Sequence, residues 1–346
     1  MPRGKFFAKA HFRGPEDIAP MVELIEAIPG LDGLDICVFG EIAGVPTNLS
    51  LIRQIVDGRI PVSLEYGDTH DTREVVDFLN PAKAYMLAFV REKLIPAANA
   101  MGAVGINLHL VANATNIHPG KLPPRFHPRE DTLNSFRDVL LGLQAAAGCS
   151  ITVENVHCIS TRRNVDDCIK FAPIGNTVQD FFDLNWPGIL DTAHLGMSLF
   201  TYQILRDLEE KGQLERVDGR EDYVWCPTQP GPYLVRFGAR ERSMVQLLPT
   251  DLTEALVVVL EKLHQVGLLK AVHLSNLAPR TPGDPFAYWD KDDKVVGAFD
   301  LRRILEFIYY KLGVTVIAEL KEVNYNEPEE PGFRSNLLQV VEMLKN

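Results

Sequence analysis

The feature of this sequence that most constrains its fold is the alternation of short apolar runs with longer segments of helical periodicity. Eight apolar, strand-like runs lie at residues 6–12, 34–39, 60–66, 104–111, 150–156, 188–191, 270–274 and 315–320. Helix-periodic segments lie at residues 15–28, 48–56, 81–101, 129–147, 178–184, 252–266, 301–312 and 336–344. In the first of these, Ile18, Met21, Val22 and Ile25 share one face. Eight strand–helix units predict a closed (β/α)₈ barrel rather than an open doubly wound sheet.

One spacing in this alternation is abnormal. About eighty residues separate the sixth run from the seventh, although a strand–helix unit usually needs about 30. We therefore expect a single barrel domain over residues 1–346 with an insertion at residues 200–250, which begins with a charged helix over residues 205–215. The aromatic residues of this insertion include Tyr223, Trp225, Tyr233 and Phe237. The insertion follows a strand, so we expect it on the face where barrel active sites form, with aromatic side chains in the cleft or in a subunit contact.

The composition narrows the class of protein. Hydrophobic residues make up 46% of the chain and charged residues 23%, which allows a sizeable core. The net charge of −11 disfavours a nucleic-acid partner. The five cysteines follow no CxxC or zinc-ribbon spacing, the N-terminus lacks a signal-like apolar region, and no run reaches the ~20 apolar residues of a membrane helix. We expect a cytoplasmic protein with no membrane partner.

Four consecutive strand-like runs in the second half of the chain end in residues that can bind a metal. These are Glu154, Asp191, His273 and Glu319. In a barrel of this type, the carboxyl ends of the strands line one cleft, so the four side chains are expected to converge. Three carboxylates this close repel one another without a cation, and a set of three oxygens and one nitrogen suits a divalent ion. The alternative is that each is an ordinary strand-end polar group satisfied by a neighbour.

These residues and their surroundings resemble the xylose-isomerase-like barrel superfamily. The resemblance rests on Glu154-Asn155, Asp191-Thr192-Ala193-His194, His273-Leu274 and Glu319 in the family order, and it covers the second half of the chain. The family includes ketose 3-epimerases, hydroxypyruvate isomerase, inosose dehydratases and apurinic endonucleases. The resemblance implies one divalent ion on the four residues, with Mn²⁺ as first choice and Mg²⁺, Co²⁺ or Zn²⁺ as alternatives.

Three further residues are candidates for substrate binding. The resemblance implies that His194 contacts substrate or a second metal, whereas the alternative is that it orients Asp191. His109, at the end of the fourth run, is a candidate for substrate or an additional metal. Arg280 lies where related epimerases often place a substrate-binding arginine, and the alternative is an ordinary surface arginine. Glu65, after the third run, is expected to be a solvated turn residue.

The function that the resemblance implies is isomerisation or epimerisation of a sugar-like hydroxy-ketone through an ene-diolate, with Glu154 and Glu319 as the catalytic acid–base pair. The expected partner is a small sugar-like substrate, and self-association into a homo-oligomer stays open. The first alternative is a dehydratase acting on an inosose or sugar acid. An endonuclease-like phosphodiesterase ranks lower, because the net charge is unfavourable and no Asp-x-His follows the seventh run. A metal-free binding barrel is the remaining alternative.

Overall fold

The structure is a computed structural model that describes residues 3–12, 15–38, 49–66, 78–79, 84–109, 112–113, 115–116, 125–126, 129–155, 173–174, 178–217, 220–227, 233–279, 289–292, 297–320 and 331–345. Among these residues, no single helix is long and apolar enough to span a membrane. One pair of helices, Ala239–Leu247 and Leu252–Gln265, meets the length and composition criteria only when taken together, and it is bent by 112°.

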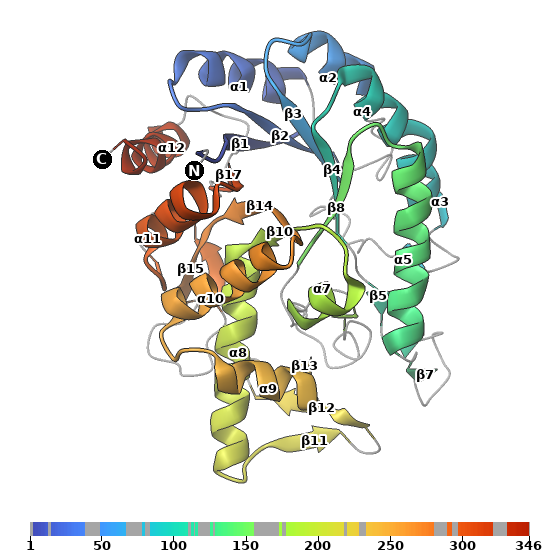
Figure 1. Ribbon diagram of the computed structural model, residues 1–346, viewed down its shortest axis with the longest axis vertical. Coiled ribbons are helices and arrows are strands. Elements are labelled where there is room, and N and C mark those ends of the chain that lie inside the picture. The colour runs from blue at the N-terminus through green and yellow to red at the C-terminus, as the bar shows by residue number, and fades with distance from the viewer. Residues whose placement is uncertain are drawn as a thin grey trace.

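Eight parallel strands close into a barrel in which the first strand pairs with both the second and the last (Figure 1). The barrel strands are β1 (Phe6–His11), β2 (Gly33–Val38), β3 (Val62–Tyr66), β4 (Gly105–His109), β8 (Ser150–Glu154), β10 (Gly188–Asp191), β14 (Leu269–Leu274) and β17 (Thr315–Ala318). Each of the eight predicted strands is present, with ends that differ by at most a few residues. The predicted (β/α)₈ barrel is therefore confirmed.

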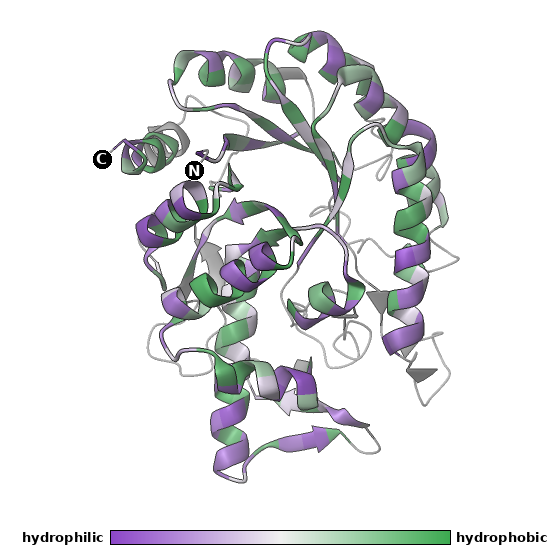
Figure 2. Cartoon of the chain, viewed as in Figure 1, coloured by the Kyte–Doolittle hydropathy of each residue, from purple (hydrophilic) through white to green (hydrophobic). Residues whose placement is uncertain are grey.

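Helices surround the barrel, and hydrophobic and hydrophilic residues alternate along them in stripes (Figure 2). They are α1 (Pro15–Ala27), α2 (Leu49–Val56), α3 (Ala84–Phe89), η3 (Val90–Leu94), α4 (Ile95–Met101), α5 (Arg129–Ala146), α7 (Val178–Leu184), α8 (Thr192–Glu210), α9 (Ala239–Leu247), α10 (Leu252–Gln265), α11 (Leu301–Glu306), η4 (Phe307–Leu312) and α12 (Pro331–Met343). η3 and η4 are π-helical stretches inside longer helices, and α12 begins earlier than predicted. The apolar stripes pack against the strands in one large core.

The helix predicted over residues 205–215 is wrong in its bounds. α8 starts directly after β10, at Thr192, and ends at Glu210, and Glu215 already belongs to a strand. Residues 192–202 are buried on most sides of the helix, so no polar face marks them as helical in the sequence. Only the exposed, charged end of α8 shows a helical pattern.

The insertion contains a small antiparallel sheet between β10 and β14. Its strands are β11 (Glu215–Val217), β12 (Arg220–Cys226) and β13 (Tyr233–Arg236). Figure 1 shows this sheet beside α9 and the far end of α8. Phe237, one of the aromatic residues predicted to lie in the cleft or in a subunit contact, is instead fully buried and stacks on Tyr202 at 5.8 Å between ring centroids. With neighbours from α8, β12 and α9 it forms a second, smaller core.

Three two-stranded ribbons complete the described strands. They pair β5 (Ala112–Asn113) with β9 (Pro173–Ile174), β6 (Thr115–Asn116) with β7 (Arg125–Phe126), and β15 (Asn276–Pro279) with β16 (Trp289–Asp292). All of them lie in connections that follow the carboxyl ends of β4, β8 or β14. These ribbons therefore lie on the same side of the barrel as the carboxyl ends of its strands, which is the face where barrel active sites form.

The interior of the barrel changes from apolar to polar along the strands. Phe7, Ile189, Ala271 and Ile317 form an apolar cluster inside the barrel. Each lies two residues before a polar residue of its strand or strand end, namely Lys9, Asp191, His273 and Glu319. Because side chains two residues apart point to the same face of a strand, these polar groups form the next layer toward the carboxyl ends. The apolar cluster is thus the floor of the polar site.

Candidate metal centre

The structure brings the four predicted ligands together. Glu154 and Asp191 end their strands, His273 lies near the end of β14, and Glu319 directly follows β17. One ligand atom from each lies within 4.8 Å of the others, and all four residues are buried. The pairing of Asp191 with His273 in adjacent strands places these two at the same level. Convergence of the strand ends, as predicted, produces the cluster.

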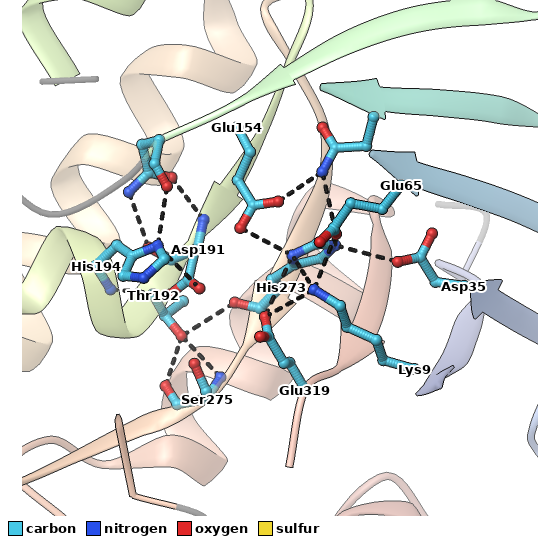
Figure 3. A network of polar contacts seen from close by, with 12 residues as sticks. Lys9, Asp35, Glu65, Glu154, Asp191, Thr192, His194, His273, Ser275 and Glu319 are labelled. Atoms are coloured by element: carbon cyan, nitrogen blue, oxygen red, sulfur yellow. Dashed lines mark hydrogen bonds and ion pairs between the residues drawn. The ribbon is translucent and has the colours of Figure 1, made fainter. Parts of the chain in front are cut away.

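His273 lies at the centre of this cluster (Figure 3). Its Nδ1 atom is 3.1 Å from Oε1 of Glu154 and 3.3 Å from Oε2 of Glu319. On the other side of the ring, Nε2 is 3.6 Å from Glu65 and 3.7 Å from Asp35. One edge of the imidazole therefore faces the predicted ligands, and the opposite edge faces carboxylates that can fix the ring orientation.

Asn155 fixes the ends of β8 and β10 relative to each other. Its side-chain amide donates to the carbonyl oxygen of Asp191 at 3.1 Å and accepts from the backbone N–H of Asp191 at 2.6 Å. The carboxylate of Asp191 also caps α8, accepting from the backbone N–H of His194 at 2.9 Å. The position of Asp191 is thus set by both a neighbouring strand and the helix that follows.

His194 contacts Asp191 directly. Nδ1 of His194 lies 3.0 Å from the carbonyl oxygen of Asn155 and 3.2 Å from Oδ2 of Asp191, and the side chain is 16% exposed. These contacts support the interpretation that His194 orients Asp191. Both contacts are made by Nδ1.

A hydroxyl group ties the start of α8 to the end of β14. Thr192 donates from Oγ1 to the carbonyl oxygen of Ser275 at 2.7 Å and accepts from the backbone N–H of Ser275 at 3.0 Å. Both residues are buried. This contact holds the strand that carries His273 against the helix that begins beside Asp191.

Residues of the first four strands complete the polar layer, and the sequence analysis missed most of them. Lys9, Asp35 and Asn107 lie in β1, β2 and β4 and are buried. Glu65, predicted to be a solvated turn residue, lies within β3 and is 2% exposed, so that prediction is wrong. The sequence pattern that could have identified these residues is a charged or amide side chain at an inward-facing position of an otherwise apolar strand.

His109 and Asn107 both contact Glu154. Nε2 of His109 lies 3.2 Å from Oε2 of Glu154 and 3.5 Å from Oε1 of Glu65. The amide of Asn107 donates to the same Oε2 of Glu154 at 2.5 Å. Oε1 of Glu154 therefore remains directed to His273. Arg280, the third predicted substrate-binding residue, lies outside the described residues.

The charges in this layer shift one another's pKa values. Burial by itself lowers the pKa of His273, but the charge and hydrogen bonding of Glu154 and the hydrogen bond with Glu319 outweigh it and raise the pKa to about 10. Burial by itself raises the pKa of Glu154, but the charges of His273 and His109 hold it well below its usual range. Burial, together with the charge of Glu65, raises the pKa of Asp35 to about 6. In the absence of a metal, protonated histidines thus balance the carboxylates.

The donor set fits a divalent cation. Three carboxylates and one imidazole, all buried and within mutual reach, match the oxygen-rich ligand sets of divalent ions of the first transition series and of Mg²⁺. A cation of charge +2 can replace the protons that the histidines otherwise carry. The residues present are therefore consistent with the divalent metal site that the sequence predicts.

Comparisons with known proteins bear on the fold. No family model and no curated protein matches the sequence. The structure is similar to that of the IOLI protein with a bound zinc atom, at 12% identity over 98% of each chain with a TM-score of 0.51. It is also similar to an AP endonuclease of family 2 from Brucella melitensis, at 14% identity over 97% of this chain and 99% of that chain with a TM-score of 0.50.

An L-ribulose 3-epimerase aligns at 12% identity over 100% of this chain and 96% of that chain, with a TM-score of 0.49. The likeness to the IOLI protein and the endonuclease is consistent with the (β/α)₈ barrel fold that the sequence predicts. At such identities the likeness reaches no further than the fold. Substrate and reaction have to be argued from the residues of the site.

Proposed function

We propose that this protein is a metal-dependent isomerase or epimerase that acts on a sugar-like hydroxy-ketone. The observation that carries the proposal is the placement of two glutamates from different strands around one imidazole edge, with Glu154 at 3.1 Å and Glu319 at 3.3 Å from Nδ1 of His273. Two such groups on different sides of a substrate allow a proton to be taken at one position and returned at another.

Glu154, Asp191, His273 and Glu319 are the proposed holders of the metal. A divalent ion bound there would supply a Lewis acid that favours the negative charge of the substrate's ene-diolate. Mn²⁺ is the ion that we propose first. The similar fold of the IOLI protein, which holds a zinc atom, supports a metal in this kind of barrel and leaves Zn²⁺ as an alternative.

The two glutamates are the proposed proton carriers. One carboxylate oxygen takes the α-proton of the substrate, and the other glutamate returns a proton to the opposite face or to the neighbouring carbon. Return to the opposite face gives epimerisation, and return to the neighbouring carbon gives isomerisation. Asn107 and His109 hold Oε2 of Glu154, so Oε1 is the atom proposed to carry the proton.

Substrate orientation is proposed for His109, His194 and Arg280. The side chains of His109 and His194 are 13% and 16% exposed, whereas the predicted metal ligands are 8% exposed or less. These two histidines therefore form the part of the layer that a substrate reaches from the cleft.

Exchange of substrate hydrogen with solvent tests this reaction directly. The metal-loaded protein is incubated in deuterated water with a panel of ketoses and inososes, and incorporation at the α-carbon is followed by mass spectrometry. Glu154→Gln and Glu319→Gln each preserve size but remove the base, so exchange is expected to fall by a factor of ~10² or more. A rate that neither substitution lowers would contradict the two-glutamate mechanism.

Glu241→Gln is the matched control for that experiment. Glu241 is a buried carboxylate of α9 that pairs with Arg236 at 3.3 Å, in the insertion rather than the barrel interior. Its substitution is expected to leave exchange per folded protein unchanged. The products identify the reaction: an epimer or isomer supports the proposal, a product that has lost water supports the dehydratase, and activity confined to a phosphodiester contradicts the proposal.

A further inference from the structure

A second acidic group lies inside the barrel, beside the proposed metal ligands. It consists of Asp35 and Glu65, which face Nε2 of His273 at 3.7 and 3.6 Å and are both buried. One atom from each of these three residues lies within 4.8 Å of the others. The two buried carboxylates provide oxygen ligands of the kind that bind a divalent cation.

The ammonium group of Lys9 lies at this second group. Nζ is 2.8 Å from Oε2 of Glu65, 3.3 Å from Oε2 of Glu319 and 3.4 Å from Nδ1 of His273. Lys9 thus contacts one carboxylate of the second group and two proposed metal ligands, Glu319 and His273, as Figure 3 shows. At 2% exposure, its charge is shared with these side chains rather than with water.

A buried ammonium group is costly unless carboxylates surround it closely. Among the described residues of this layer, Lys9 is the only lysine or arginine, whereas Asp35, Glu65, Glu154, Asp191 and Glu319 are all acidic. A neutral residue at position 9 would therefore leave Glu65 facing other carboxylates without a permanent counter-charge. Lys9 therefore supplies the permanent positive charge beside Glu65.

We infer that Lys9 takes the place of a second divalent ion and so limits the barrel to one. The inference rests on the metal centre of the proposed function. A divalent ion on Asp35 and Glu65 would lie against the ammonium group, because Nζ already contacts Glu65. Lys9 is therefore a residue that sets the metal stoichiometry, and it also positions Glu319 through their ion pair.

Metal stoichiometry tests the inference without reference to catalysis. Wild type, Lys9→Gln and Lys9→Arg are each stripped with a chelator, dialysed against Mn²⁺ or Zn²⁺, and analysed by mass spectrometry for metal per chain. Wild type is expected to bind one ion. Lys9→Gln, which removes the charge but keeps an amide donor, is expected to bind a second ion at least tenfold more tightly than any second ion in wild type.

Lys9→Arg controls for the charge, and a double variant checks the location of the second ion. Lys9→Arg keeps the charge and is expected to bind one ion. The double variant Lys9→Gln/Glu65→Gln removes a ligand of the second group and is expected to return to one ion. If Lys9→Gln is unfolded when stripped, its refolding is titrated with metal, and dependence of the folded fraction on two equivalents supports the inference.

Two results would overturn the inference: tight binding of two ions by wild type, or binding of a single ion by Lys9→Gln. If wild type binds no ion at all, the proposed metal centre is contradicted, and the proposed function and this inference fail together. If wild type and Lys9→Gln each bind one ion, the inference about Lys9 fails but the proposed metal centre stands. Because the measured quantity is the number of metal ions per chain, this test of Lys9 does not depend on which substrate the protein converts.

Discussion

At the scale of single residues, protons and a divalent cation compete to balance the same carboxylates. His273 carries a pKa raised to about 10 by Glu154 against the effect of burial, compared with its ordinary value of 6.5. A group whose pKa is higher in the folded protein than in the unfolded chain stabilises the folded protein. This stabilisation is complete at pH values below the pKa of the unfolded chain, and it is lost as the pH rises toward the pKa of the folded protein. The pKa of Asp35 is raised to about 6, so this residue also makes the folded protein less stable as the pH rises, but over a lower pH range.

The metal-free protein is therefore expected to lose stability as the pH is raised from 6.5 to 9. The loss from His273 is on the order of a few kcal/mol, because each pKa unit corresponds to about 1.4 kcal/mol. Thermal unfolding in the presence of a chelator measures it. Added Mn²⁺ is expected to reverse the loss, and its affinity should increase over the same range because binding displaces protons.

A metal-free melting temperature that stays constant or rises between pH 6.5 and 9 would contradict this prediction. His273→Asn provides the control, since it removes the titrating ring while retaining a polar side chain. In that variant the fall in stability over this pH range is expected to be smaller. Any fall that remains is assigned to His109, whose pKa is also raised by Glu154 and Glu65 against burial.

The sequence predicted the convergence of the four proposed ligands because each closes an apolar run at the end of a strand. It did not indicate Lys9 or Asp35, which lie inside strands rather than at their ends. Only the alternation of inward and outward positions marks them, and that alternation becomes interpretable once barrel closure decides which face is inside. Their ion pairs also join strands that are distant in sequence, which a linear pattern does not reveal.

At the scale of elements, Asn155 connects β8 with β10 through two hydrogen bonds to the backbone of Asp191. Asn155→Ala removes both bonds but leaves the four proposed ligands in place. Because such supporting contacts orient a ligand, metal affinity is expected to fall by about 10- to 100-fold. Competition with a fluorescent chelator measures the affinity.

Asn99→Ala is the matched control for Asn155→Ala. Asn99 makes the same kind of double contact, accepting from the backbone N–H of Gly148 at 2.7 Å and donating to the carbonyl oxygen of Ala146 at 3.2 Å. It connects α4 to the end of α5, outside the metal centre. Its loss should lower stability and leave metal affinity unchanged. Equal effects of the two substitutions on affinity would argue against a specific role for Asn155.

The elements that the sequence predicted well are those whose ends coincide with a change between apolar and polar residues. α7 and β10 match their predicted bounds, because a clear boundary of apolar residues defines each. α8 was misplaced because its first half is buried on most sides, between the barrel and β15. The cap that starts this helix is Asp191, a residue that the sequence marks equally well as a metal ligand.

At the scale of the whole molecule, the insertion has a smaller apolar core of its own but also packs on the main core through Tyr223, Val217 and Trp225. Buried ion pairs add a polar connection between the two. Arg236 of β13 lies 3.3 Å from Asp180 of α7 and 3.3 Å from Glu241 of α9, and all three residues are buried. Asp180 also accepts from Arg129 of α5 at 2.7 Å. Arg236 is thus a buried cation that links the insertion to α7, and the more exposed Arg240 of α9 pairs with Asp183, also of α7.

Arg236→Met is expected to loosen the insertion without weakening the metal centre. The substitution leaves Glu241 buried without its cation, and breaking a buried pair in this way costs roughly 3 kcal/mol or more. Hydrogen exchange should then increase most in β12, β13 and α9, while the barrel strands keep their protection, because the insertion has a smaller core of its own. Metal affinity is expected to stay within about twofold of wild type, since Arg236 contacts none of the four proposed ligands in the described part of the chain.

Arg242→Met separates this effect from the general cost of removing an arginine. Arg242 pairs with Glu209 at 2.9 Å within the insertion, but the two side chains are 21% and 32% exposed, so its loss should cost about 1 kcal/mol or less. If Arg236→Met instead lowered metal affinity strongly, the inserted sheet would support the site through the helices around the barrel. If it increased exchange evenly across the chain, the insertion and the barrel would unfold as one unit, and the two cores would be a single cooperative structure.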